Sequence, residues 1–163
     1  KKFLTINAAF AYTDGKYVKF TNAPVPLEET GGATFKDISG GVLPGISKFA
    51  LSFGAEGSTK EFKFINQKTK FFVAADVYYR SGFSSSPSPS AYLNIKGYAL
   101  LNARLGLQAA EGFSIFVWGR NITNTKYFEQ LLPGAGNAGQ YAAVLGDPVT
   151  FGVTLRYAWK QKF

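Results

Sequence analysis

The sequence predicts an all-β chain that forms part of a transmembrane, antiparallel, up-and-down β-barrel. Aromatic residues make up 17% of the 163 residues, yet mean hydropathy is only −0.02. Apolar and polar residues alternate along six segments, which is the two-residue period of a strand with two different faces. These segments run for roughly nine to twelve residues, which matches tilted membrane-spanning strands of about nine to eleven better than soluble strands of about five or six.

The first three expected strands lie in residues 3–14, 48–56 and 71–80. The even positions of the first and the odd positions of the other two are apolar. Polar residues such as Asn7, Ser52 and Asp76 occupy the opposite face. Because side chains alternate across a strand, each segment is expected to have one apolar and one polar side.

The last three expected strands lie in residues 98–108, 113–120 and 150–159, and all three are apolar at odd positions. In residues 98–108, Leu101 and Leu105 oppose Asn102 and Arg104. We therefore expect Leu105 to face lipid near mid-depth and Asn102 to face the barrel interior.

The connections alternate in length. The long loops are residues 15–47 and 122–148, residues 81–97 form a loop of medium length, and residues 109–112 form a short turn. Part of the intermediate segment 57–70 is interpreted as continued strand. The Ser/Pro-rich run 84–90 is interpreted as a mobile loop. Outer-membrane barrels pair long extracellular loops with short periplasmic turns, which directs the C-terminus to the periplasm.

A soluble all-β domain is the main alternative, since its strands also alternate. Its loops, however, are rarely as long as those expected here. Aromatic residues also gather near strand ends, as they do at the interfaces of membrane barrels. They are Phe10, Tyr12, Tyr79, Phe113, Tyr157 and Trp159. Together these features favour the membrane barrel.

The composition excludes several kinds of chemistry. The chain contains no Cys and no His, so thiol nucleophiles and histidine bases or ligands are excluded, and we expect no catalytic site, metal or cofactor. The absence of Met indicates a processed or partial chain.

The net charge is +8, but no basic stripe interleaved with aromatics is evident, so nucleic acid is not expected as a partner. Many lysines are expected at the periplasmic end of the strands, among them Lys60, Lys63, Lys68 and Lys70. We interpret these lysines as a solvated rim near anionic head groups. Glu56 is assigned to the same end.

Two segments resemble the TonB-dependent outer-membrane receptors. Residues 119–127 (GRNITNTKY) are similar to the end of that family's penultimate strand, and residues 146–152 (GDPVTFG) to the entry of its last strand. Residues 37–45 and 97–107 also resemble the family. The terminal Phe163, which follows Tyr157 and Trp159, is similar to the assembly signal of outer-membrane barrels. Departures are Val149 and Asn124, where Arg and Asp are frequent, and a tail lengthened by residues 160–162.

The motif residues have expected structural roles. Asn121 and Asn124 tolerate left-handed backbone where a strand gives way to a loop. Pro148 cannot donate to a sheet ladder and suits the first residue of a strand. Gly152 leaves the interior side uncrowded, and Gly146 is assigned a structural role with the rest of its motif.

The resemblance implies a receptor of the bacterial outer membrane that imports a scarce nutrient, such as a siderophore-like chelate, a vitamin or a glycan. It implies a barrel of about twenty-two strands around an N-terminal plug. The implied partners are the rest of the barrel, the plug, TonB through an N-terminal part outside this chain, outer-membrane lipids and the barrel-assembly machinery. Six strands cannot enclose a plug, so this chain is expected to be one piece of the barrel.

Residues near the outer mouth combine cations with aromatic rings, which would suit an anionic or aromatic chelate. These candidates are Arg80, Tyr98, Trp118, Arg120, Tyr127 and Tyr141. Pairing of interior arginines with plug carboxylates is the alternative role, and the one we favour. For the whole protein, a passive porin-type channel remains an alternative. An outer-membrane barrel enzyme is disfavoured because no nucleophile has an evident base.

Overall fold

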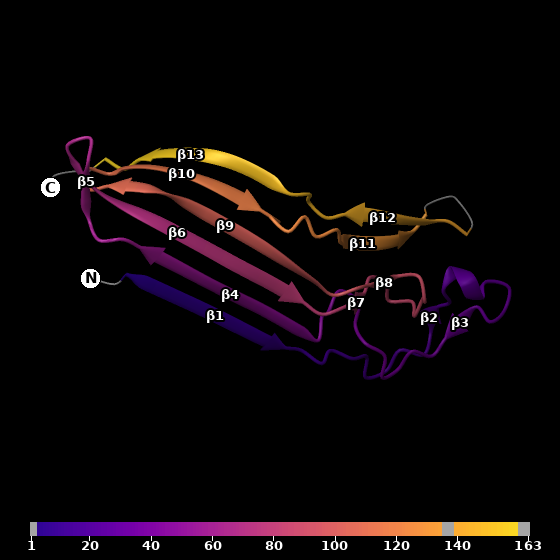
Figure 1. Ribbon diagram of the computed structural model, residues 1–163. Coiled ribbons are helices and arrows are strands. Elements are labelled where there is room, and N and C mark those ends of the chain that lie inside the picture. The colour runs from indigo at the N-terminus through magenta and orange to yellow at the C-terminus, as the bar shows by residue number, and fades with distance from the viewer. Residues whose placement is uncertain (1–2, 135–138, 160–163) are drawn as a thin grey trace.

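The computed structural model describes residues 3–134 and 139–159 and is all-β, with antiparallel sheets. All six expected long strands are confirmed, and their ends differ from the expected ones by at most four residues (Figure 1). They are β1 (Leu4–Tyr12), β4 (Phe49–Ser58), β6 (Gln67–Arg80), β9 (Tyr98–Ala109), β10 (Phe113–Arg120) and β13 (Thr150–Tyr157).

The remaining elements are short. The expected strand continuation within residues 57–70 is confirmed, because β5 (Phe62–Phe64) forms a hairpin with the first residues of β6. The long connections contain small ribbons and one 3-10 turn. They are β2 (Ala23–Pro24) with β3 (Phe35–Lys36), β7 (Phe83–Ser84) with β8 (Asn94–Ile95), β11 (Phe128–Pro133) with β12 (Tyr141–Leu145), and η1 (Leu27–Glu29).

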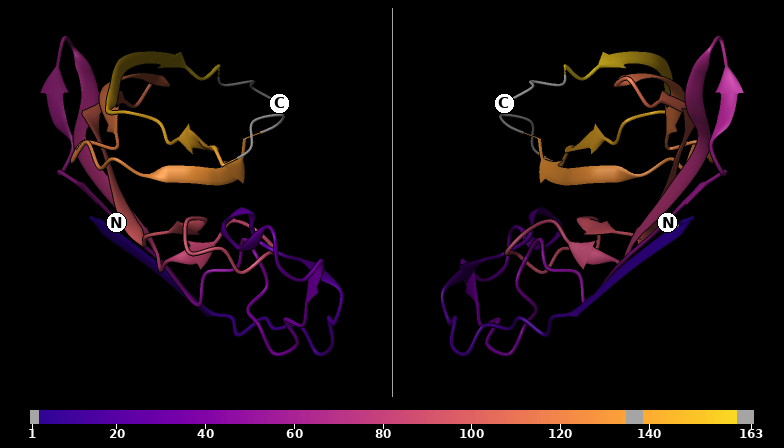
Figure 2. Two further views of the ribbon diagram at one scale, coloured as in Figure 1. Left: turned by 90° about the vertical axis from the view of Figure 1, so that its right-hand side faces the viewer. Right: turned by 90° about the vertical axis from the view of Figure 1, so that its left-hand side faces the viewer.

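The main sheet is a meander in which each long strand pairs with its neighbours along the chain, in the order β1-β4-β6-β9-β10-β13. All long connections therefore emerge at one end of the sheet, which we call the loop end, and the short ones at the other, the turn end (Figure 1). Figure 2 shows that the sheet is bowed rather than flat. Within the described residues its edges are β1 and β13, and the sheet does not close on itself.

The pairing register joins the apolar positions of all six strands into one surface, the apolar face. Leu105, for example, is paired with Val73 on one side and Val117 on the other. Residues paired directly across antiparallel strands share a face. The opposite side, the polar face, aligns Asp76 with Asn102 in the same way. The sequence-based assignment of the two faces is thus confirmed for every long strand.

The apolar face is not covered by other parts of the described chain. Leu105, in a central strand, retains 45% exposure, and Phe151 on the edge strand retains 72%. The buried hydrophobic residues lie instead among the loops, at Ala23, Ile38, Leu93 and Ile95. Exposed apolar patches of this continuity mark a surface that contacts another apolar phase or partner. Among the described residues, none of the helical structure is long or apolar enough to cross a membrane.

The loop end is a packed layer of the three long connections. The Ser/Pro-rich run is part of it: Ser88 and Ser90 are buried, and the Ser88 hydroxyl donates to the Pro24 carbonyl at 2.5 Å. Ser85 both accepts from the Leu131 amide and donates to its carbonyl. Serine hydroxyls that bond nearby backbone in this way order the turns they occupy.

Candidate functional site

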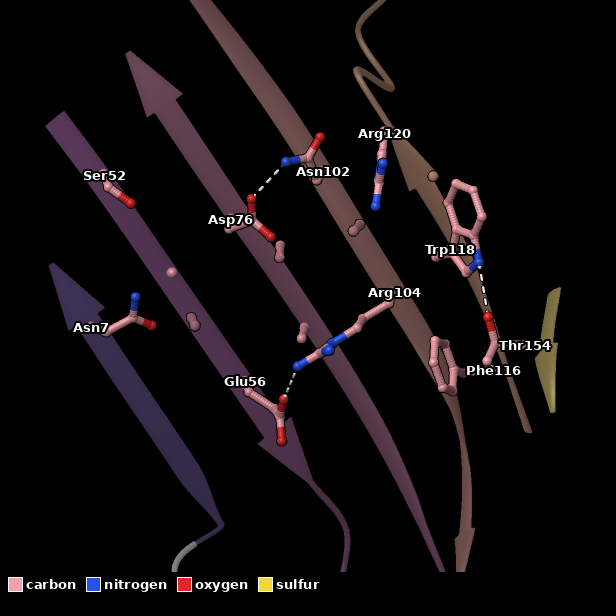
Figure 3. A pocket seen from close by; sticks show the side chains of 16 residues that line it. Asn7, Ser52, Glu56, Asp76, Asn102, Arg104, Phe116, Trp118, Arg120 and Thr154 are labelled. Atoms are coloured by element: carbon pink, nitrogen blue, oxygen red, sulfur yellow. Dashed lines mark hydrogen bonds and ion pairs between the residues drawn. The ribbon is translucent and has the colours of Figure 1, made fainter. Parts of the chain in front are cut away.

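The polar face is hollowed, with an open volume of about 790 Å³ near the middle of the sheet (Figure 3). Its walls come from all six long strands, because each strand contributes alternate side chains to this face. The labelled lining residues are Asn7, Ser52, Glu56, Asp76, Asn102, Arg104, Phe116, Trp118, Arg120 and Thr154.

Two pairs of polar side chains connect different strands across the hollow. Arg104 Nη2 lies 2.8 Å from Glu56 Oε2, and Asn102 Nδ2 donates to Asp76 Oδ2 at 2.7 Å (Figure 3). Glu56 lies towards the turn end of β4, on the polar side that the alternation of residues 48–56 predicts. Glu56 belongs to β4 and faces the hollow, because the strand extends to Ser58. The Arg104–Glu56 ion pair cancels two opposite charges of the hollow, whereas the neutral Asn102 amide only orients the Asp76 carboxylate.

The Trp118 indole packs against Gly152. Its Nε1 donates to Thr154 Oγ1 at 3.1 Å (Figure 3). A Cβ at position 152 would overlap the indole, which explains the glycine at this place in β13. Gly152 is thus on the polar face, where the indole occupies the space that a side chain would take. The Arg120 guanidinium stands over the Trp118 ring, 5.4 Å from its centroid.

Of the two arginines that line the hollow, Arg120 has fewer contacts with other described residues than Arg104. Its described contacts are limited to the Trp118 ring, and no carboxylate within the described residues pairs with it. Arg104, by contrast, is held by Glu56. An exposed arginine beside an aromatic face can bind a planar anion through two N–H donors. Arg120 and Trp118 are thus the two sequence candidates that the structure brings together in the hollow.

The other candidates form separate groups towards the loop end. Tyr98 and Tyr127 stack with ring centroids 4.3 Å apart, and the Tyr127 ring covers Gly146 so closely that a Cβ there would overlap it. Desolvation raises the pKa of Tyr127. Arg80 holds a loop: its guanidinium donates to Ser47 Oγ and to the Gly45 carbonyl, and it stacks on Phe83. The six candidates therefore do not form one site.

Asn121 connects the two motif segments. Its side chain, with the residue only 4% exposed, donates from Nδ2 to the carbonyls of Thr125 and Asp147, at 2.9 and 3.0 Å, and accepts from the Thr125 amide. Its backbone N–H donates to Asn102 Oδ1 at 3.0 Å. The left-handed backbone expected at Asn121 and Asn124 is confirmed, with φ of 46° and 49°. Pro148 was expected to be a strand's first residue, but β13 begins at Thr150, since residues 146–149 still bond to this turn.

Glu28 joins the three long loops and was not identified from the sequence. Its Oε2 accepts from the Tyr141 hydroxyl at 2.6 Å, and its Oε1 accepts from the Ala91 amide at 2.8 Å. The hydrogen bond from Tyr141 is the main cause that lowers the pKa of Glu28 to about 2, and the same bond raises the pKa of Tyr141. A glutamate in a long loop carries no local pattern, so only the contacts between loops reveal this role.

At the turn end, Tyr157 and Trp159 contact each other edge to face and are both exposed, whereas Phe163 lies outside the described residues. The described part of the chain holds no group of three or more residues suited to bind a metal. Comparison of the chain with models of protein families, with curated proteins and with solved structures gives no match.

Proposed function

We propose that this chain forms a C-terminal part of the wall of a bacterial outer-membrane β-barrel, in a TonB-dependent receptor that imports a scarce nutrient. The observation that carries the proposal is the register of the main sheet. It aligns every apolar position of six long strands on one exposed face and the polar positions on the other. Membrane barrels have this arrangement, with lipid outside and a polar interior.

Two further observations support the barrel. Its aromatic residues lie near both ends of the apolar face: Phe49 contacts both Phe10 and Tyr12 at the loop end, and Tyr157 contacts Trp159 at the turn end. Such bands match the interfaces of a bilayer. The two edge strands, β1 and β13, are where further strands of the barrel would pair, because unpaired backbone is costly in lipid.

The receptor function rests on the two motif segments, 119–127 and 146–152, which resemble TonB-dependent receptors. Asn121 supports this by bonding one segment to the other, so the resemblance concerns one connected structural unit. In the proposed orientation, Arg120 and Trp118 face the interior. There they would contact either a carboxylate of the plug or an anionic substrate in transit.

The test uses the intact protein in its native membrane. Cell fractionation should place it in the outer membrane, and unboiled samples should migrate faster in gel electrophoresis than boiled ones, as folded barrels do. Uptake of the nutrient should stop when TonB is removed. Recovery in the soluble fraction would refute the membrane barrel. Uptake that persists without TonB would favour a passive channel.

A further inference from the structure

The hairpin of residues 59–70 at the turn end has a tip that the fold does not explain. Its two-residue turn consists of Ile65 and Asn66, with φ of 44° and 57°. Asn adopts left-handed backbone readily, whereas a β-branched residue does so at a steric cost. Ile65 is nevertheless 81% exposed, so no burial within the described chain offsets this cost. An exposed, strained isoleucine points to a contact outside the chain.

One side of the hairpin is apolar. The register places Phe62 opposite Thr69 and Phe64 opposite Gln67, on the same side as the apolar face. Both phenylalanines are exposed, with Phe64 at 47%, while Thr69 beneath them is buried. Phe64 and Ile65 border an apolar groove of about 380 Å³ whose other walls belong to the apolar face, including Leu107, Phe113 and Tyr157.

The other side of the hairpin is basic. Lys63 and Lys68 are direct cross-strand partners, an arrangement in which like charges repel. Neither has an ion pair within the described residues; Lys70 lies 3.9 Å from Glu61, and Glu111 bonds to Gln67. Residues 60–70 hold four lysines and one glutamate. The repulsion between Lys63 and Lys68 would be relieved by an anion between their ammonium groups.

We infer that this hairpin is a binding site for anionic phospholipid. Its apolar side would lie against acyl chains along the groove. Lys63 and Lys68 are on the opposite side, but they lie beyond Thr69 and Ala109, the last pair of β6 with β9. Their long side chains would therefore reach around the end of the wall to lipid phosphates in the head-group layer. The inference rests on the proposed membrane location. An acidic soluble partner would match the lysines but would leave Phe62, Phe64 and Ile65 exposed. A neutral bilayer would match the apolar side but not the repelling lysines. Anionic lipid satisfies both.

The test is a competition between two lipids on the intact, detergent-solubilised protein. Phosphatidylglycerol and phosphatidylcholine with identical acyl chains are offered in equal amounts, and native mass spectrometry gives the ratio of the two bound. The wild type should prefer phosphatidylglycerol. Removing both charges with K63Q and K68Q should lower this preference by about fivefold per lysine. The matched control, K96Q with K126Q at the loop end, should retain it.

A second variant tests the apolar side separately. Ile65→Gly relieves the left-handed strain and removes the exposed side chain, so less of both lipids should bind while their ratio stays unchanged. An equal preference in wild type and K63Q/K68Q would overturn the lipid site. Polyglutamate serves as a probe for an acidic protein partner. The lipid site would also be overturned if K63Q/K68Q lost polyglutamate binding but kept the lipid preference of the wild type, because that result would indicate such a partner. A protein that stays soluble without detergent and takes up neither lipid would instead refute the proposed membrane barrel.

Discussion

The Tyr141 hydroxyl donates a hydrogen bond to the Glu28 carboxylate at 2.6 Å, across 113 residues of sequence. Glu28 also accepts from the Ala91 amide, so one side chain joins all three long loops. Tyr92 stacks against the Tyr141 ring, 5.3 Å between centroids, and adds an apolar contact at the same place. A change of protonation can thus break the contact that joins all three loops, whereas the serine–backbone bonds between pairs of loops do not titrate.

The first prediction concerns pH. The pKa of Glu28 is about 2 in the folded chain against 4.5 ordinarily, so its contribution is present above pH 4.5 and is lost as the pH falls towards 2. The pKa of Tyr141 is raised, so its contribution is present below pH 10 and is lost as the pH rises further. Spin labels at Ala33 and Ala143 of the intact protein should show a narrow distance distribution at pH 7 that broadens near pH 2.5.

Two variants separate the effect of the Tyr141 hydroxyl from that of the aromatic rings. Tyr141→Phe should broaden the same distance distribution already at pH 7, because Glu28 loses its donor. Tyr92→Phe keeps the stacked ring and should leave the distribution narrow. Identical distributions in Tyr141→Phe and the wild type at both pH values would show that this bond does not hold the loops.

Asn121→Ala should lower the free energy of unfolding by about 3 kcal/mol, measured by urea titration of the intact protein in lipid vesicles. The variant loses the bonds to Thr125 and Asp147 and places Ala in left-handed backbone. Asn124→Gly is the control, since Gly accepts the φ of 49° and only a 3.5 Å contact to Val149 is lost. Comparable losses in the two variants would argue against the role of Asn121 as the connection between the segments.

Gly152→Ala should displace the Trp118 indole, because the added Cβ overlaps it. The indole would lose its bond to Thr154, and overpacking should cost about 1–3 kcal/mol. The chain has two tryptophans, so a Trp159→Phe background lets a shift in fluorescence be assigned to Trp118 within this chain. Gly57→Ala is the control, because the nearest atom to its added Cβ, the Phe3 carbonyl oxygen, lies 3.9 Å away. An unshifted Trp118 emission in Gly152→Ala would contradict the packing described here.

The membrane proposal predicts unequal costs for arginine on the two faces. Leu105→Arg places the charge on the apolar face and should cost roughly 2–4 kcal/mol near the middle of a bilayer. Asn102→Arg faces the polar side and should cost less, although it also loses bonds to Asp76 and Asn121. Ser52→Arg, on the same face and without a described side-chain bond, is therefore the cleaner control. Reversible unfolding in vesicles measures all three. Equal costs for Leu105→Arg and Ser52→Arg would mean that the apolar face does not contact lipid.

Much of the fold was predictable because side-chain alternation is a local property of extended backbone. Leu105 and Asn102 could be assigned to opposite faces from the sequence alone, and the register confirms both assignments. The left-handed backbone at Asn121 and Asn124 was predictable for the same reason, since it depends on residue type and the end of a strand. The start of the last strand was predicted wrongly at Pro148, because residues 146–149 bond to the turn at Asn121 and Asn124, which lies outside any local window.

The sequence by itself determined which residues share a face, because covalent geometry points successive side chains of a strand to opposite sides. Only the tertiary structure decided which strands and loops meet. It set Trp118 against Gly152, Tyr98 against Tyr127, and Glu28 between two other loops. These contacts join residues that are distant in sequence. The alternating pattern does not specify the direction of the turns between them, so the contacts depend on how the whole chain folds and cannot be predicted from a local pattern.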